Sequence, residues 1–178
     1  MGRYAQLCPI IYGKGTINLL GEEVKKLGCN KIMMVSGKIM VKSDTYAKCK
    51  KSLLEAGIKL VEFNEIVPEP PDFIINKGGE IAKKEGVDGI VAIGGGSPMD
   101  AAKAINILIN NPPPINQYFG NPFYKPGVPV VMVVTTAGTG SESTGIGVIT
   151  DTINNVKNSV IGTATLGILD PETTVTVP

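Results

Sequence analysis

The sequence predicts an α/β fold, namely a Rossmann-like open and mostly parallel sheet with helices on both faces, plus a small β-hairpin region near the C-terminus. Three observations predict it. Short apolar runs alternate with segments of helical period along most of the 178 residues, which is typical of βαβ units. After Thr144 the helical segments give way to short runs separated by turn residues. The composition, 43% hydrophobic and 19% charged, suits a single domain over residues 1–178.

The first half of the chain supplies the first units in order. We expect an edge strand within residues 4–12, because Pro9 interrupts that run. Thr16 is then expected to cap a helix that Gly28 ends. The same reasoning predicts strands at 31–36, 58–63 and 88–93, a helix at 43–56, and a helix that begins at Asp72 and stops at Gly86.

The second half begins with a helix that prolines stop after Asn111. A loop is predicted at 116–127, a strongly apolar strand at 128–134 and a small-residue loop at 135–142. Short strands follow at 145–150, 156–161 and 167–169, with a hairpin turn at 151–155. In an open parallel sheet, ligands bind at the carboxyl ends of the strands, so the loops there are expected to gather at one edge.

The turn that follows the 88–93 strand is the main candidate site. It reads Gly94-Gly95-Gly96-Ser97-Pro98, and we expect Ser97 to be the helix N-cap with Pro98 at the first helical position. Glycines allow close approach of a ligand, and free N–H groups at a helix start attract phosphate. The alternative is a plain tight turn. The strict GxGxxG fingerprint is not present, because Met99 occupies the third glycine position.

The 135–142 loop is the second candidate, since its hydroxyls and glycines could hold a ribose, a base edge or a diphosphate. The alternative is a flexible loop that uses these hydroxyls for local backbone bonds. Glu142 could serve as a base, although a solvated charge is more common. Lys157 is either solvent-exposed or a phosphate or ribose contact. Lys103 is expected to be a charge on the outer face of its helix.

Composition excludes several classes of function. The net charge of +1 gives no electrostatic case for nucleic acid or a membrane surface, and no apolar run reaches the ~20 residues of a membrane span. Histidine is absent, which excludes a Ser-His-Asp apparatus and histidine-based metal sites in this chain. Three scattered cysteines suit buried, reduced thiols better than metal ligands or disulfides. With no apolar signal-peptide core at the start, we expect a cytoplasmic protein.

Two long segments, 92–104 (AIGGGSPMDAAKA) and 135–142 (TTAGTGSE), resemble the iron-containing (group III) alcohol dehydrogenases. Tyr12-Gly13-Lys14-Gly15 and Leu169-Asp170-Pro171-Glu172 are further landmarks in the expected order. The resemblance implies an enzyme whose N-terminal α/β domain, like that of dehydroquinate synthase, binds NAD(P). It also implies an all-helical C-terminal domain that binds Fe²⁺ or Zn²⁺, and hydride transfer between a small primary alcohol and its aldehyde.

The resemblance further implies that Gly95, Gly96 and Ser97 hold the cofactor diphosphate, that Asp100 lies near the cofactor ribose, and that Lys157 contacts a ribose hydroxyl. The full set of expected cofactor-binding residues is Gly37, Gly94, Gly95, Gly96, Ser97, Asp100, Thr135, Thr136, Thr139, Ser141 and Lys157. No catalytic residue and no metal ligand is assigned to this chain.

Two departures from the family pattern are informative. Many members follow the 31–36 strand with a carboxylate that takes the adenosine ribose hydroxyls, whereas this chain has Ser36-Gly37-Lys38. The change predicts preference for, or tolerance of, NADP. The family's metal ligands, one aspartate and three histidines, lie beyond the matching segment. We therefore expect a chain that binds cofactor and turns nothing over alone. Without the helical domain an apolar face should be exposed, which predicts self-association, as in a homo-oligomer, or marginal stability. A dehydroquinate synthase or glycerol dehydrogenase-like relative and a non-catalytic nucleotide-binding module are the alternatives.

Overall fold

The computed structural model describes residues 7–175, and a six-stranded sheet forms its centre. The strand order is β1-β8-β5-β4-β2-β3, and every neighbouring pair is parallel. A separate antiparallel hairpin joins β6 and β7. The strands are β1 (Ile10–Tyr12), β2 (Lys31–Gly37), β3 (Lys59–Ile66), β4 (Gly89–Gly94), β5 (Val130–Val134), β6 (Ile146–Asp151), β7 (Val156–Ile161) and β8 (Leu166–Leu169).

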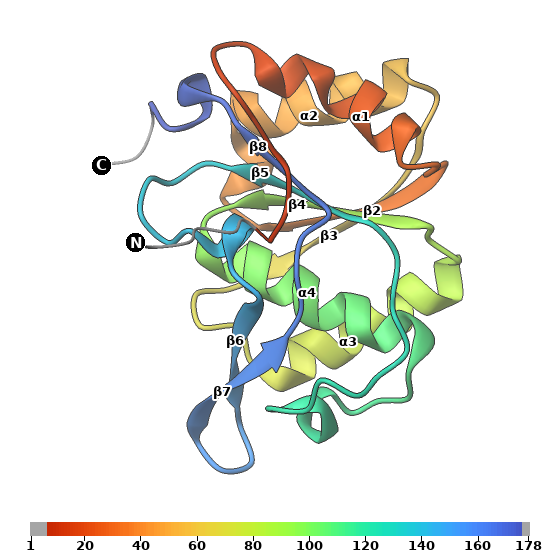
Figure 1. The fold of residues 1–178 in the computed structure, drawn as a ribbon, viewed down its shortest axis with the longest axis vertical. Helices are drawn as coiled ribbons and strands as arrows, with labels where there is room; N and C mark the ends of the chain where they lie inside the picture. Colours follow the sequence, from red (N-terminus) through yellow and green to blue (C-terminus); the bar gives the residue numbers. More distant parts are fainter. Residues whose placement is uncertain (1–6, 176–178) are drawn as a thin grey trace, which may run out of the picture.

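Helices cover both faces of the sheet (Figure 1). The helices α1 (Leu20–Lys26) and α2 (Asp44–Glu55) lie on one face, and α3 (Asp72–Glu85) and α4 (Gly96–Asn110) lie on the other. Successive strand residues point to opposite faces, so β4 sends Ile90 and Ala92 into the core under α3 and α4 and Val91 and Ile93 into the core under α1 and α2. The predicted Rossmann-like fold, with its small hairpin, is confirmed.

Several boundaries differ from the sequence prediction for identifiable reasons. The first strand is short and lies at the sheet edge, as Pro9 indicated, while residues 4–6 of the predicted range lie outside the described residues. Thr16 opens a 3₁₀ helix, Thr16–Leu19, before α1 begins. The fifth strand starts at Val130 and not at residue 128, because the N–H of Val128 donates to Oδ1 of Asn106 (2.8 Å).

The hairpin of β6 and β7 lies against α4, on the face of the sheet that α3 and α4 cover (Figure 1). Gly147 makes this approach possible, because a Cβ there would lie 2.9 Å from the backbone oxygen of Asp100 in α4. A parallel bridge between Pro71 and Thr150 joins the hairpin to the start of α3. The hairpin therefore forms a wall beside the carboxyl-terminal edge of the sheet, where the candidate site lies.

Candidate functional site

The glycine turn connects β4 directly to α4, without a linking loop. Gly94 has φ +146°, which favours glycine, and Gly95 is the N-cap of a helix that begins at Gly96. The prediction that Ser97 is the N-cap is wrong, because the bends at Gly94 and Gly95 complete the reversal and leave Ser97 inside the first turn. Pro98 is the third helical residue, two positions deeper than predicted. The first-turn N–H groups of Gly96 and Ser97 have no partner within the helix and can receive an anion.

The 135–142 loop packs directly on this turn. The N–H of Thr135 donates to the oxygen of Gly94 (3.0 Å). A Cβ on Gly95 would lie 3.0 Å from Oγ1 of Thr136, and one on Gly96 would lie 3.2 Å from Cγ2 of Thr139. The structure thus brings together the two segments that the sequence singled out, and a side chain at either glycine would press on a threonine side chain of the loop.

A buried polar cluster lies behind the loop. The hydroxyl of Ser141 donates to Oδ1 of Asp100. Lys103 is only 2% exposed, so its predicted place on the outer face of the helix is wrong. Its ammonium donates to the backbone oxygens of Ser141 (2.7 Å), Thr144 (3.1 Å) and Ile146 (2.6 Å), and also approaches the hydroxyls of Ser141 and Thr144. Burial lowers the pKa of Lys103, and Asp100 opposes that shift.

Glu142 does not have the solvated position that is usual for a glutamate. It is 8% exposed, and its Oε2 atom is enclosed without a hydrogen-bond partner in the part of the chain that the structure describes.

The predicted burial of the three cysteines is confirmed. Burial raises the pKa of Cys8, which donates a hydrogen bond to the backbone oxygen of Glu142.

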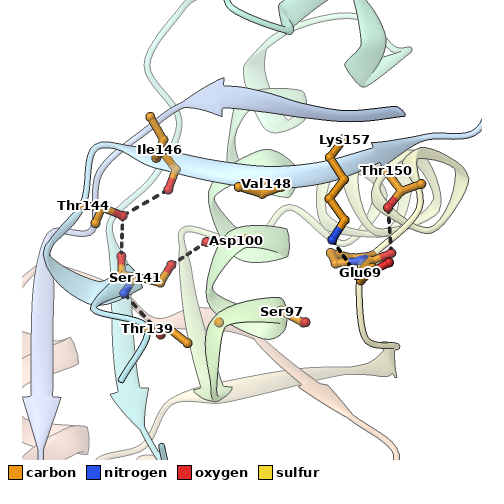
Figure 2. A pocket seen from close by; sticks show the side chains of 12 residues that line it. Glu69, Ser97, Asp100, Thr139, Ser141, Thr144, Ile146, Val148, Thr150 and Lys157 are labelled. Carbon is orange, nitrogen blue, oxygen red and sulfur yellow. Dashed lines mark hydrogen bonds and ion pairs between the residues drawn. The ribbon is translucent and has the colours of Figure 1, made fainter. Parts of the chain in front are cut away.

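Two cavities meet at the glycine turn, and both are lined by Gly96 and Ser97. The first, about 320 Å³, lies between α4 and the hairpin and is shown in Figure 2. Its other lining residues are Glu69, Pro70, Asp100, Thr139, Ser141, Thr144, Ile146, Val148, Thr150 and Lys157. We call it the hairpin cavity. The second, about 400 Å³, lies beside the end of β2 and contains Gly37, Lys38 and Gly94 to Pro98; we call it the β2 cavity.

The predicted site residues are thus distributed over this one edge. Asp100, Thr139, Ser141 and Lys157 line the hairpin cavity, and Gly37, Gly94 and Gly95 line the β2 cavity. Thr136 lines a third cavity of about 580 Å³ near Leu169 and Asp170, on the far side of the 135–142 loop. Thr135 is buried beneath the loop and lines none of the three cavities.

Sequence reasoning found Lys157 of the hairpin but missed Glu69 and the β6 residues Ile146, Val148 and Thr150 as parts of this site. The Nζ atom of Lys157 lies 2.5 Å from Oε1 of Glu69, across the end of the hairpin cavity. In the sequence, the Pro68-Glu69-Pro70-Pro71 run indicates a break in regular backbone structure before the helix at Asp72. Its position at the carboxyl end of a predicted strand was a signal that could have identified Glu69, since that edge is where ligands bind.

Asp72 anchors the hairpin to α3. It is 4% exposed and accepts hydrogen bonds from Nδ2 of Asn116 (2.7 Å), from the N–H and hydroxyl of Thr152 (3.2 and 2.7 Å) and from the N–H of Phe73 (2.8 Å). Burial raises the pKa of Asp72, but the hydrogen bonds from Asn116 and Thr152 outweigh it, so the net pKa is lowered.

We expect Asp72→Asn to destabilise the protein by about 2 kcal/mol at neutral pH, because an amide cannot accept all four bonds. A lowered folded-state pKa contributes stability above the ordinary aspartate value of about 3.9, which is lost as the pH falls through the folded-state value. Thermal melts from neutral to acidic pH should therefore converge for wild type and variant. Asp44, the exposed first residue of α2, provides the matched control Asp44→Asn. Parallel curves for Asp72→Asn and wild type would contradict this role.

Within residues 7–175, no group of three or more His, Cys, Asp and Glu side chains is arranged to hold a metal ion. None of the helices described is long and apolar enough to cross a membrane.

The parallel sheet with helices on both faces and cavities at its carboxyl-terminal edge places the chain among the Rossmann-like α/β proteins. A family model described as iron-containing alcohol dehydrogenase matches residues 9–171. The chain therefore belongs to the iron-containing alcohol dehydrogenase family.

Individual relatives agree with this assignment. The chain is 39% identical to an NAD-dependent methanol dehydrogenase of Bacillus methanolicus, over 94% of this chain and 45% of the relative. The structure of NADH-dependent butanol dehydrogenase A from Thermotoga maritima superimposes with a TM-score of 0.92 and 30% identity, covering 100% of this chain and 46% of that one. The structure of sulfoacetaldehyde reductase from Bifidobacterium kashiwanohense in complex with NAD⁺ superimposes with a TM-score of 0.87 and 29% identity. The match covers 100% of this chain and 48% of that one. The chain spans about half the length of these relatives.

Proposed function

We propose that this chain is the dinucleotide-binding part of an iron-dependent alcohol dehydrogenase and that it binds NAD(P) at the glycine turn. The observation that carries the proposal is the cradle at Gly95 and Gly96, where even a Cβ would meet the threonines of the 135–142 loop. Two N–H groups at the start of a 15-residue helix face this cradle. The relatives named above depend on NAD or NADH or were solved with NAD⁺. The residues present therefore fit a dinucleotide.

The proposed roles follow from the positions of the residues. Gly95, Gly96 and Ser97 receive the diphosphate, and the two cavities on either side of them receive the two nucleoside halves. Gly37 lies in the β2 cavity, so this cavity is proposed to take the adenosine half. Asp100 holds the hydroxyl of Ser141 and so fixes the wall of the hairpin cavity. When bound, the nicotinamide cofactor supplies the hydride acceptor or donor.

The described residues do not fit a catalytic metal, and we therefore assign no step through one to this chain. In the intact enzyme we propose that ligands from outside these 178 residues hold the iron or zinc, and that a small primary alcohol and its aldehyde are the substrates. We propose that the chain alone binds cofactor without turnover. The test is to add Fe²⁺ or Zn²⁺, NADP and butanol and follow the ultraviolet absorbance of reduced nicotinamide. Robust reduction of NADP would refute the proposal that this chain binds cofactor but needs further residues for turnover. Cofactor binding without reduction supports it.

Cofactor choice can be tested separately. The residues that line the β2 cavity include Lys38 and, in the described part of the chain, no carboxylate. A 2′-phosphate would therefore meet an ammonium and no repelling charge. We expect NADP to bind this chain at least as tightly as NAD by isothermal titration calorimetry. Lys38→Gln should lower the affinity for NADP several-fold and leave the affinity for NAD unchanged. Lys59→Gln, at an exposed position outside the β2 cavity, is the control. A clear NAD preference in the wild type would overturn this proposal without affecting dinucleotide binding itself.

A further inference from the structure

Glu69 and Lys157 form an exposed ion pair at the hairpin cavity, and the fold does not depend on this pair for its stability. The two side chains come from the segment before α3 and from β7, and they remain 65% and 58% exposed. Such pairs contribute little to stability. Both residues line the hairpin cavity together with Ser97 of the first turn of α4 (Figure 2). The pair therefore presents a carboxylate and an ammonium to whatever enters this cavity.

The backbone of Glu69 is fixed in an uncommon conformation. Its φ is +52°, in the left-handed region that non-glycine residues seldom adopt. The hydroxyl of Thr150 donates to the backbone oxygen of Glu69 (3.1 Å), and the N–H of Thr150 donates to that of Pro70 (2.9 Å). Prolines on both sides restrict the segment further. The same hairpin that carries Lys157 thus holds the backbone of Glu69 in place.

The position of the cavity identifies which part of a dinucleotide would meet this pair. Among the residues that the structure describes, the hairpin cavity and the β2 cavity share only Gly96 and Ser97. On the proposed function, the diphosphate lies at that shared point and the adenosine half lies beside Gly37. The other half, nicotinamide riboside, then enters the hairpin cavity, and its ribose is the part next to the diphosphate.

We propose that Glu69 is a specificity-determining residue that recognises the nicotinamide ribose. A ribose diol offers two hydroxyls, each of which can donate and accept a hydrogen bond. A carboxylate supplies only acceptors and an ammonium only donors, so Glu69 and Lys157 complement the diol between them. A carboxylate that receives ribose hydroxyls is an established way to select a nucleotide with a free diol. This inference rests on the proposed dinucleotide function and adds to it a residue that the family resemblance did not supply.

The opposite role for Glu69 makes a different prediction. If Glu69 only neutralised Lys157, it would compete with the cofactor for the ammonium, and its removal would strengthen binding. If Glu69 receives the ribose hydroxyls, its removal weakens binding, because a charge-assisted hydrogen bond is lost. The sign of the change in affinity therefore separates the two roles.

The experiment is isothermal titration calorimetry of the 178-residue chain with NAD, nicotinamide mononucleotide and AMP. We expect Glu69→Ala to lower the affinity for NAD and for nicotinamide mononucleotide about tenfold and to leave the affinity for AMP unchanged. Glu65→Ala is the matched control, because Glu65 forms a similar exposed pair with Lys77 (2.7 Å) outside both cavities. A second probe is an NAD analogue whose nicotinamide ribose lacks the 2′-hydroxyl. The wild type should bind this analogue more weakly than it binds NAD, whereas Glu69→Ala should bind the two equally well.

Unchanged or tighter NAD binding by Glu69→Ala overturns the role of Glu69 and leaves the proposed function intact, since the wild type still binds NAD. Equal losses for AMP and nicotinamide mononucleotide also overturn it, because they show a general distortion of the site. Failure of the wild type to bind NAD overturns both proposals. Melting curves of the two variants should coincide with that of the wild type, which shows that the affinity change is not a folding effect.

Discussion

Gly95→Val is expected to abolish dinucleotide binding while the fold is retained. Gly95 has φ −92° and ψ −153°, an extended conformation with negative φ, so the backbone does not require glycine in the way that Gly94 does. The new side chain, however, would project where the glycine turn meets the 135–142 loop. Its Cβ would lie 2.9 Å from Cγ2 of Thr136, and it would add bulk to a residue that lines the β2 cavity beside the place proposed for the diphosphate. We expect affinity for NAD and NADP to fall by at least about 100-fold, or about 2.8 kcal/mol.

Calorimetry gives the affinities, and circular dichroism with a thermal melt shows whether the fold is retained. Gly162→Ala is a suitable control, because a Cβ at Gly162 meets its nearest neighbour, Cβ of Lys103, at an ordinary 3.5 Å. Gly94→Val is a useful contrast. Gly94 has φ +146°, so that substitution strains the backbone and should lower stability as well as binding. Unchanged affinity in Gly95→Val would remove the glycine turn from the site.

Much of the fold was accessible from the sequence because its signals are local. Apolar runs such as 90–93 and the end signals at Ser43 and Gly86 are read within one element, and the structure places Ser43 at the N-cap of α2 and Gly86 at the C-cap of α3. The convergence of the glycine turn, the 135–142 loop and Gly37 also followed from one rule about parallel sheets. These predictions required no knowledge of which side chains touch.

Apart from the N-cap at Ser97, which is a local error of two residues, the errors at the site concern residues whose environment is set by distant segments. Lys103 belongs to a helix whose period does not reveal that a loop about 40 residues later covers it, with partners 38 to 43 positions away in sequence. Glu69 and Lys157 are 88 positions apart and meet because the hairpin docks at the start of α3, through the contact of Asp72 with Thr152 and the bridge between Pro71 and Thr150. A lysine or glutamate in a sequence is assigned to solvent by default, and only tertiary packing reverses that assignment.

Lys103→Met is expected to have the largest effect on stability. The ammonium of Lys103 donates to three backbone oxygens of the Ser141–Ile146 segment. It also interacts electrostatically with the carboxylates of Asp100 and Glu142. Methionine fills a similar volume but donates nothing, so those oxygens would stay buried without a partner. Removing one member of a buried charge network costs about 3 kcal/mol. For a domain of this size that corresponds to a fall in Tm of roughly 6–12 °C.

The same substitution should also weaken cofactor binding, because Ser141, Thr144 and Ile146 all line the hairpin cavity and Lys103 holds them from behind. Lys84→Met, at an exposed position in α3, is the matched control and should change the free energy of unfolding by less than about 0.5 kcal/mol. Lys103→Arg keeps the charge, but a planar guanidinium cannot point toward the same five oxygens, so an intermediate loss is expected. If Lys103→Met melts with the wild type, the ammonium does not organise this segment, and the wall of the hairpin cavity is stabilised by other contacts.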